Sequence, residues 1–316
     1  MLIYATALAI EAAPIVRRLD LALKESRGGF RIYGGKEKEY PSGGVFLTVT
    51  GTGLLQSSAA AAYVLGRLGA GAGDVLVNFG MAGASAASPL VRGDAVLPVK
   101  FTREGERDLY PDILFPAGML PANIRKGIAV TVTGAAKAEG GRKEKTDSAA
   151  AARFPAELPA VYDNEAYGLI RTAGMILGTQ GALSVKVVSD FIGDTAGSGG
   201  VISKDGAAAV IEAAADSAIA FSEAYHSFIS GKFAENAAQK DLPPDLLGTW
   251  ENISRCLSLS FARAELLKNL MRRDCYAGTD ARSKYAEIAA EAAAFRGDKK
   301  AGLEFFEAFL AGSEYI

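Results

Sequence analysis

Residues 45–68 read VFLTVTGTGLLQSSAAAAYVLGRL, and this pattern points to a fold class. The run Val45–Thr50 is apolar without in–out alternation, which is typical of strands that are buried on both faces. The turn Gly51-Thr52-Gly53 follows, and an Ala-rich helix is predicted over Leu55–Leu68. A buried strand that leads through glycines into a helix is the repeating unit of α/β proteins with a largely parallel sheet.

The same alternation recurs along residues 1–233. Further strands are predicted over Leu2–Ala9, Phe30–Tyr33, Val75–Phe79, Asp94–Phe101, Ala129–Thr133 and Leu183–Ser189. Further helices are predicted over Ala12–Leu23, Glu165–Leu177 and Lys204–Ile229. We therefore predict that residues 1–233 form a three-layer α/β domain.

Beyond residue 233 only helical signals remain, and they follow Pro243-Pro244. Apolar residues recur there every three or four positions as one predicted stripe: Trp250, Ile253, Leu257, Ala264, Leu267 and Met271. Two more helices are predicted over Ser283–Phe295 and Ala301–Leu310. Residues 234–316 are therefore predicted to be an all-helical C-terminal extension. We expect its stripe to pack on the α/β domain or on a second subunit.

The composition excludes several classes of protein. Hydrophobic residues make up 49% and charged residues 22% of the 316 residues, which is typical of a globular chain. The net charge of -2 gives no basic field for nucleic acid, and no apolar run reaches the roughly 20 residues of a membrane span. One His and two Cys are too few for a multi-His metal site or a disulfide framework. We expect a cytoplasmic protein without metal or cofactor, whose chemistry rests mainly on carboxylates.

Three acidic residues lie just beyond the predicted carboxyl ends of strands or at the start of a helix, where α/β sheets place their sites. Glu11 follows the first strand, Glu165 begins a predicted helix, and Asp190 ends the apolar run that starts at Leu183. Burial beside that run would raise the pKa of Asp190 and suit it to donate a proton. Each residue alone is also compatible with a helix cap or a solvated turn.

Two glycine-rich segments are predicted as turns after strands: Gly51-Thr52-Gly53 and Asn78–Ala84. Glycines at such places let a ligand approach the backbone, and helix N-termini attract anions. Neither segment completes a P-loop or the dinucleotide pattern G-x-G-x-x-G, so each alone is also compatible with a plain tight turn.

Taken in order, these segments resemble the nucleoside phosphorylase superfamily, most of all its methylthioadenosine/S-adenosylhomocysteine nucleosidase branch. The matching pieces are Glu11, Gly51-Thr52-Gly53, Asn78–Ala84, Val91-Arg92-Gly93-Asp94, Asn164-Glu165-Ala166 and Val188-Ser189-Asp190. The resemblance covers residues 1–230. It implies a phosphorylase/hydrolase-like domain with a mixed, mostly parallel central sheet, and a homodimer or a higher homo-oligomer.

The resemblance also implies roles for single residues. Asp190 would be the general acid that protonates the purine N7, and Glu11 would orient and deprotonate the attacking water. Glu165 would accept hydrogen bonds from ribose hydroxyls, and Lys186 stands where the nucleosidases carry Arg, near that water. The implied substrate-binding residues are Glu165, Asn164, Ser189, Gly80, Met81 and Lys186. The implied function is hydrolysis of the N-glycosidic bond of a purine nucleoside or a related nucleoside metabolite.

Departures from the family pattern leave alternatives open. The phosphorylases carry an arginine for phosphate just before their glycine-rich turn, and Leu76–Gly80 holds none, so hydrolysis is favoured over a phosphate-dependent nucleoside phosphorylase. Met81 replaces a serine, Asn164 replaces a methionine, and Val132–Lys137 holds no aromatic residue to stack on adenine. The second alternative is therefore a noncatalytic nucleoside-binding homologue that acts through its C-terminal helices. The segment Arg107–Ile113 either contributes contacts to the base or the 5′ substituent or is a structural loop.

Overall fold

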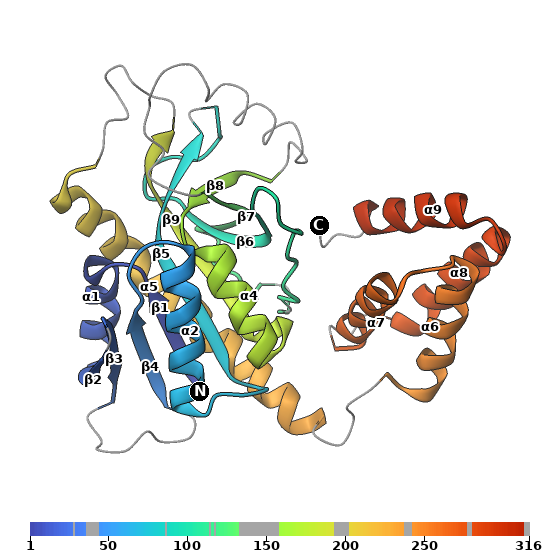
Figure 1. Ribbon diagram of the computed structural model, residues 1–316, viewed down its shortest axis with the longest axis horizontal. Coiled ribbons are helices and arrows are strands. Elements are labelled where there is room, and N and C mark those ends of the chain that lie inside the picture. Colours follow the sequence, from blue (N-terminus) through green and yellow to red (C-terminus); the bar gives the residue numbers. More distant parts are fainter. Residues whose placement is uncertain are drawn as a thin grey trace. The chain divides into compact units, whose positions relative to one another are not determined.

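The computed structural model (Figure 1) describes residues 1–27, 29–35, 44–85, 87–113, 115–116, 118–132, 158–192, 202–236, 242–276 and 280–312. The chain forms two compact units. The first comprises Met1–Ile113 with Ala117–Ser230, and the second comprises Leu114–Pro116 with Gly231–Ile316.

The first unit is built on one mixed sheet. Its described strands are β1 (Leu2–Thr6), β2 (Ala22–Arg27), β3 (Phe30–Gly34), β4 (Val45–Val49), β5 (Val75–Ser85), β6 (Ala95–Thr102), β7 (Ile124–Thr131), β8 (Ala160–Asp163) and β9 (Ala182–Ile192). Their order is β2-β3-β4-β1-β5-β8-β7-β6-β9, with an additional pairing of β5 with β9. Strands β4, β1, β5 and β9 run parallel, whereas β8 is antiparallel to β5 and β6 is antiparallel to β9. Because β9 returns to β5, the long strands β5 and β9 lie side by side.

Helices pack against this sheet and form the other layers of the first unit. The described helices of the first unit are α1 (Ala9–Arg18), α2 (Leu54–Leu68), α4 (Ala166–Leu177) and α5 (Lys204–Asn236, which runs into the second unit), with a 3-10 turn η1 (Thr179–Gly181). Figure 1 shows α2 in front of the sheet and α5 behind it. Ion pairs of Arg17 and Arg18 with Glu212 join α1 to α5. The predicted α/β fold class with a mixed central sheet is confirmed.

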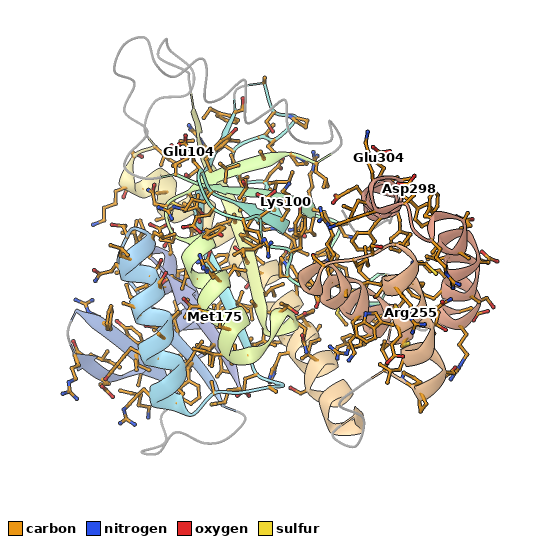
Figure 2. All side chains as sticks on the ribbon, turned by 45° about the vertical axis from the view of Figure 1, so that its right-hand side comes forward. Lys100, Glu104, Met175, Arg255, Asp298 and Glu304 are labelled. Carbon is orange, nitrogen blue, oxygen red and sulfur yellow. The ribbon has the colours of Figure 1, made fainter. Side chains whose placement is uncertain are left out.

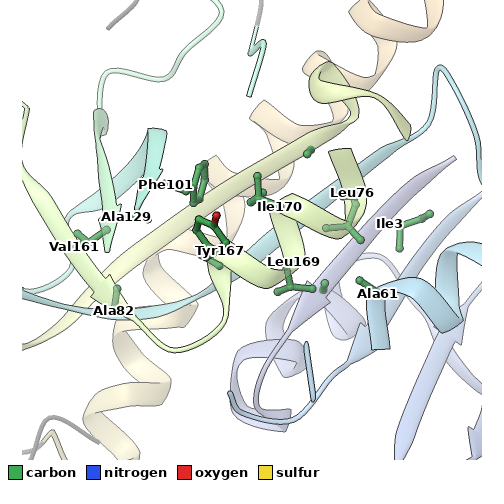
Figure 3. Close-up of a cluster of buried hydrophobic side chains, with 14 of the residues drawn as sticks. Ile3, Ala61, Leu76, Ala82, Phe101, Ala129, Val161, Tyr167, Leu169 and Ile170 are labelled. Atoms are coloured by element: carbon green, nitrogen blue, oxygen red, sulfur yellow. The ribbon is translucent and has the colours of Figure 1, made fainter. Parts of the chain in front are cut away.

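An apolar core lies between the sheet and the helices α2 and α4. Side chains of all three elements meet there (Figure 3): Ile3, Leu76, Ala61, Leu169 and Ile170. The two helices approach closely, because a β-carbon on Gly168 of α4 would stand 2.9 Å from the carbonyl oxygen of Leu54 of α2. The close approach holds the N-terminus of α4 next to that of α2, where part of the candidate site lies.

The structure corrects several predicted elements. The helix predicted over Ala12–Leu23 is wrong at its end, because α1 stops at Arg18, Asp20 adopts a positive φ of 50°, and β2 begins soon after. The segment Asn78–Ala84, expected to be a turn, is instead the second half of β5, since its backbone pairs with β9 and, near its end, with β8. No strand is predicted from the sequence at β2 or at the short β8.

The second unit is helical and has its own core. Its described elements are α6 (Pro244–Cys256), α7 (Phe261–Tyr276), α8 (Ala281–Ala292), η2 (Ala293–Phe295) and α9 (Lys299–Gly312). The core includes Ile253, Cys256, Leu257, Leu267, Met271, Tyr285 and Phe306. Two helices, α6 and α7, share the predicted apolar stripe, and it packs inside this unit, which corrects the expectation that it packs on the α/β domain or a second subunit.

Polar side chains cover this helical unit. Figure 2 shows Arg255, Asp298 and Glu304 on it, and all three are exposed. Within the unit, Trp250 Nε1 donates a hydrogen bond of 2.7 Å to the carbonyl oxygen of Ala264 and so ties α6 to α7. In the part of the chain that the structure describes, no helix of either unit combines the length and the apolarity required to cross a membrane.

Candidate active site

The candidate site lies where parallel strands end and helices begin. Strand β1 leads into α1, β4 leads toward α2, and β8 leads toward α4. Between them, β5 and β9 run in register, with Gly80 opposite Lys186 and Gly83 opposite Asp190. The first N–H groups of a helix have no partner inside the helix and carry partial positive charge, so this edge of the sheet favours carboxylates.

Glu11 is buried in the first turn of α1, with 3% of its surface exposed. Its Oε2 accepts hydrogen bonds of 2.9 Å from the backbone N–H groups of Ala7 and Leu8, and its Oε1 accepts one of 2.8 Å from Met81 N–H. Burial raises the pKa of Glu11, whereas the positive charge of Lys186 and the N–H groups of Met81 and Leu8 act in the opposite direction. Glu11 is therefore a rigidly held carboxyl group whose pKa is raised by burial against the opposing effects of Lys186 and the N–H groups.

Gly80 leaves the space that this carboxyl group occupies. A β-carbon on Gly80 would stand 2.7 Å from Oε1 of Glu11, closer than real β-carbon contacts. Any side chain at this position would thus displace the carboxyl group. Gly80, which the family resemblance implies to be a substrate-binding residue, lies against Glu11 and permits the close approach of α1 to β5.

Glu165 lies at the N-cap of α4 and is buried as well, with 6% exposed. Its Oε1 accepts a hydrogen bond of 2.8 Å from the backbone N–H of Gly53, the N-cap residue of α2, whose φ is 93°. Its backbone oxygen accepts a hydrogen bond of 3.3 Å from Ser57 Oγ. The glycine turn before α2 therefore orients a side chain of α4, and a positive φ at this position favours glycine.

Asp163 and Lys186 form a buried ion pair that sequence reasoning does not single out. Lys186 Nζ lies 2.7 Å from Oδ2 of Asp163, and their side chains are 2% and 1% exposed. Thr131 Oγ1 donates to Oδ1 at 2.7 Å, and the backbone N–H of Ala166 donates to Oδ2 at 2.8 Å. Burial alone would lower the pKa of Lys186, but the charges of Asp163, Glu165 and Glu11 raise it. A signal was present in the sequence, because a lysine inside an apolar strand requires a buried anionic partner.

Ser189 and Asp190 lie at a β-bulge in β9. Ala82 is opposite Val188 and Gly83 is opposite Asp190, so Ser189 is the extra residue. Its Oγ lies 2.6 Å from Oδ1 of Asp190 and 3.3 Å from the carbonyl oxygen of Ala82. Bulges re-aim the side chains that follow them, and they are frequent next to active sites. Asp190 is only partly buried, unlike Glu11 and Glu165.

The remaining predicted residues fall into three groups. Met81 and Asn164 are partly exposed, on β5 and directly before Glu165. The segment Arg107–Ile113 is tied to the fold, since the Arg107 carbonyl oxygen accepts a hydrogen bond of 2.6 Å from the Tyr167 hydroxyl, which favours its interpretation as a structural loop. Residues 133–137, considered for adenine stacking, lie outside the described residues. Among the residues that are described, no group of three or more His, Cys, Asp or Glu could hold a metal ion.

Comparison with known proteins identifies solved structures that have a similar fold. No protein-family model matches the chain, and no curated protein matches it. A Streptococcus pneumoniae MTA/SAH nucleosidase in complex with 8-aminoadenine is 18% identical with a TM-score of 0.55, over 71% of this chain and 99% of that one. An Arabidopsis thaliana 5′-methylthioadenosine nucleosidase is 16% identical with a TM-score of 0.54, over 73% and 96%. A Helicobacter pylori futalosine hydrolase mutant is 11% identical with a TM-score of 0.52, over 72% and 98%. The chain thus shares its fold with these nucleosidases and this hydrolase, over about seven tenths of its length.

Proposed function

We propose that this chain hydrolyses the N-glycosidic bond of a purine nucleoside or a related nucleoside metabolite. The observation that carries this proposal is the setting of Glu11: a buried carboxyl group held by three backbone N–H groups directly over Gly80. A general base works best when its pKa lies near the working pH, and burial moves the pKa of Glu11 in that direction. The fold shared with three nucleosidases supports the same reaction class.

Each proposed role follows from the charge that develops in the reaction. Cleavage of an N-glycosidic bond creates positive charge on the sugar and negative charge on the departing base. Asp190, partly exposed and within 2.6 Å of Ser189 Oγ, donates a proton to the base. Glu165, held by Gly53 N–H, accepts hydrogen bonds from the ribose hydroxyls and stabilises the cationic sugar. Glu11 takes the proton of the attacking water.

Water fits this site better than phosphate as the nucleophile. The buried charges that the structure places there are the carboxyl groups of Glu11, Asp163 and Glu165 and the ammonium group of Lys186. The positive charge of Lys186 is already paired with Asp163 at 2.7 Å. A phosphate dianion would therefore enter a region of negative charge, and the buried charges described there include no arginine to bind it in a bidentate way.

The test is base release from a panel of nucleosides. The full chain is incubated with methylthioadenosine, S-adenosylhomocysteine, futalosine, adenosine and inosine, with and without inorganic phosphate, and the products are separated chromatographically. We expect free base and free sugar from at least one substrate at the same rate in both conditions. A sugar 1-phosphate that appears only with phosphate would establish a phosphorylase instead. A thermal shift on nucleoside binding without base release would establish a noncatalytic binding protein.

A further inference from the structure

Three buried carboxyl groups surround one buried ammonium group at the edge of β5 and β9. As whole residues, backbone included, Glu11, Asp163 and Glu165 are 3%, 6% and 6% exposed, and Lys186 is 2% exposed. They come from four elements: α1, the end of β8, the N-cap of α4 and β9. A buried charge without a partner is strongly unfavourable, so this arrangement requires either a shared cation or protonated carboxyl groups.

The register of β5 and β9 places Lys186 beside Glu11. Paired residues of parallel strands direct their side chains to the same face of the sheet, and Lys186 is paired with Gly80. A β-carbon on Gly80 would point at Oε1 of Glu11. Glu11 therefore lies next to the Lys186 side chain, in the space that a larger side chain at position 80 would fill. The ammonium group itself is fixed at 2.7 Å from Asp163, which Thr131 and Ala166 hold in turn.

We propose that Lys186 is a positioning residue of this site: anchored on Asp163, its ammonium group holds one positive charge against Glu11 and Glu165 and favours the ionised form of Glu11. The inference rests on the proposed function in one respect, namely that the ionised form of Glu11 is the form that activates water. The charged groups that face Lys186 are Glu11 from α1, Asp163 from β8 and Glu165 from α4. In the absence of this charge, the three carboxyl groups repel one another and Glu11 takes up its proton at a higher pH.

Substitutions separate this charge role from a merely structural one. Lys186→Met keeps a long apolar stem but removes the charge, so we expect Glu11 to be protonated at higher pH than in the wild type. Lys186→Arg keeps the charge and should leave the pH at which Glu11 is protonated close to that of the wild type. Asp163→Asn combined with Lys186→Met removes one of the three carboxyl groups and should reverse part of the change. A purely structural role predicts the opposite: the double variant would shift the Glu11 titration at least as far as Lys186→Met does.

The experiment is an NMR titration of the full chain labelled with ¹³Cδ-glutamate, in which Glu11→Gln assigns the Glu11 resonance. We expect Lys186→Met to raise the midpoint of Glu11 by about one pH unit or more, because a close opposite charge moves the pKa of a carboxyl group by ~1–3. Lys186→Arg should move the midpoint by less than half as much, and the double variant should lie between the wild type and Lys186→Met. An unchanged midpoint in Lys186→Met, or a double variant whose midpoint moves at least as far as that of Lys186→Met, overturns the proposal.

Two further measurements keep the test decisive. If Lys186→Met does not fold, the double variant, which replaces an ion pair by neutral side chains of similar size, is compared with the wild type alone. Its Glu11 midpoint must still be raised, and an unchanged or lowered midpoint overturns the proposal. Lys204→Met, at an exposed lysine of α5, is the matched control and should leave the titration unchanged.

The activity profile completes the test where turnover is found. The acid limb of kcat/KM should move to higher pH in Lys186→Met. Activity on that limb should fall ~10-fold for each pH unit by which the limb moves, and the loss should narrow as the pH rises. A loss that is equal at every pH contradicts the proposal. Absence of turnover in the wild type would refute the proposed function alone, because the titration of Glu11 needs no substrate.

Discussion

Oε1 of Glu11 lies 2.7 Å from the point where a β-carbon of residue 80 would stand, so the carboxyl group of α1 depends on the glycine of β5. Gly80→Ala should push the carboxyl group away from Met81 N–H. We expect a lower free energy of unfolding by about 1–3 kcal/mol from overpacking. We also expect base release to fall by ~10²-fold, because a displacement of about 1 Å can cost that much. Chemical denaturation and the base-release assay measure the two effects.

Gly174→Ala is the matched control for this substitution. A β-carbon on Gly174 of α4 would meet nothing within 4 Å, and helix propensity favours alanine over glycine by about 1 kcal/mol. We therefore expect unchanged or slightly increased stability and full activity. Equal losses in both variants would show that Glu11 does not depend on the space over Gly80.

Gly168→Ala tests the contact that holds the start of α4 against α2. Its β-carbon would collide with Ser58 Oγ and would stand 2.9 Å from the carbonyl oxygen of Leu54, so the helices would have to move apart. We expect a loss of about 1–3 kcal/mol in the free energy of unfolding, measured by urea denaturation. Gly66→Ala, on an exposed and unobstructed position of α2, should show no loss, and an equal loss there would contradict the packing argument.

Asp190→Asn tests the proposed proton donor. The side chain is partly exposed, so the amide should leave the fold intact while removing the proton. We expect base release to fall by ~10²–10⁴-fold, the range of general acid catalysis. Asp205→Asn, at an exposed acidic residue in the first turn of α5, is the control and should retain full activity. Retention of more than half the wild-type rate in Asp190→Asn would exclude this residue as the acid.

The sequence singles out three of the four acidic side chains that the candidate site contains, but not the fourth. Glu11, Glu165 and Asp190 are recognisable because each directly follows or begins an element whose apolar pattern is visible. Asp163 is not, since its importance depends on Lys186, a partner that only the folded sheet brings within reach.

The missed elements have similar physical causes. Asn78–Ala84 is rich in glycine and alanine, which indicates a turn, but its pairing with β9 and β8 holds it extended. The apolar stripe from Trp250 to Met271 does predict a buried face, but not that it belongs to two helices that bury it against each other. Local patterns show which side chains are buried. The element against which they are buried depends on pairing between segments that lie far apart in the sequence.

Glu11 should also make stability depend on pH. Burial raises its pKa in the folded state above the ordinary value of 4.5, so its contribution to stability is fully present below that value. This contribution is lost as the pH rises through the raised pKa, by up to about 1.4 kcal/mol for each pH unit by which the pKa is raised. We therefore expect the free energy of unfolding of Glu11→Gln, measured by urea denaturation, to increase relative to that of the wild type as the pH rises from 4 to 8. A difference that stays constant over this range, or changes in the other direction, would contradict a raised pKa of Glu11 in the folded state.

In the proposed reaction, water attacks the anomeric carbon of a nucleoside in this site. The most direct measurement is turnover in ¹⁸O-labelled water with inorganic phosphate present, followed by mass spectrometry of the sugar product. We predict free sugar that carries the water label at C1, released together with free base and lost in Asp190→Asn. Unlabelled sugar 1-phosphate, or the absence of any base release from a nucleoside that the protein binds, would contradict the claim.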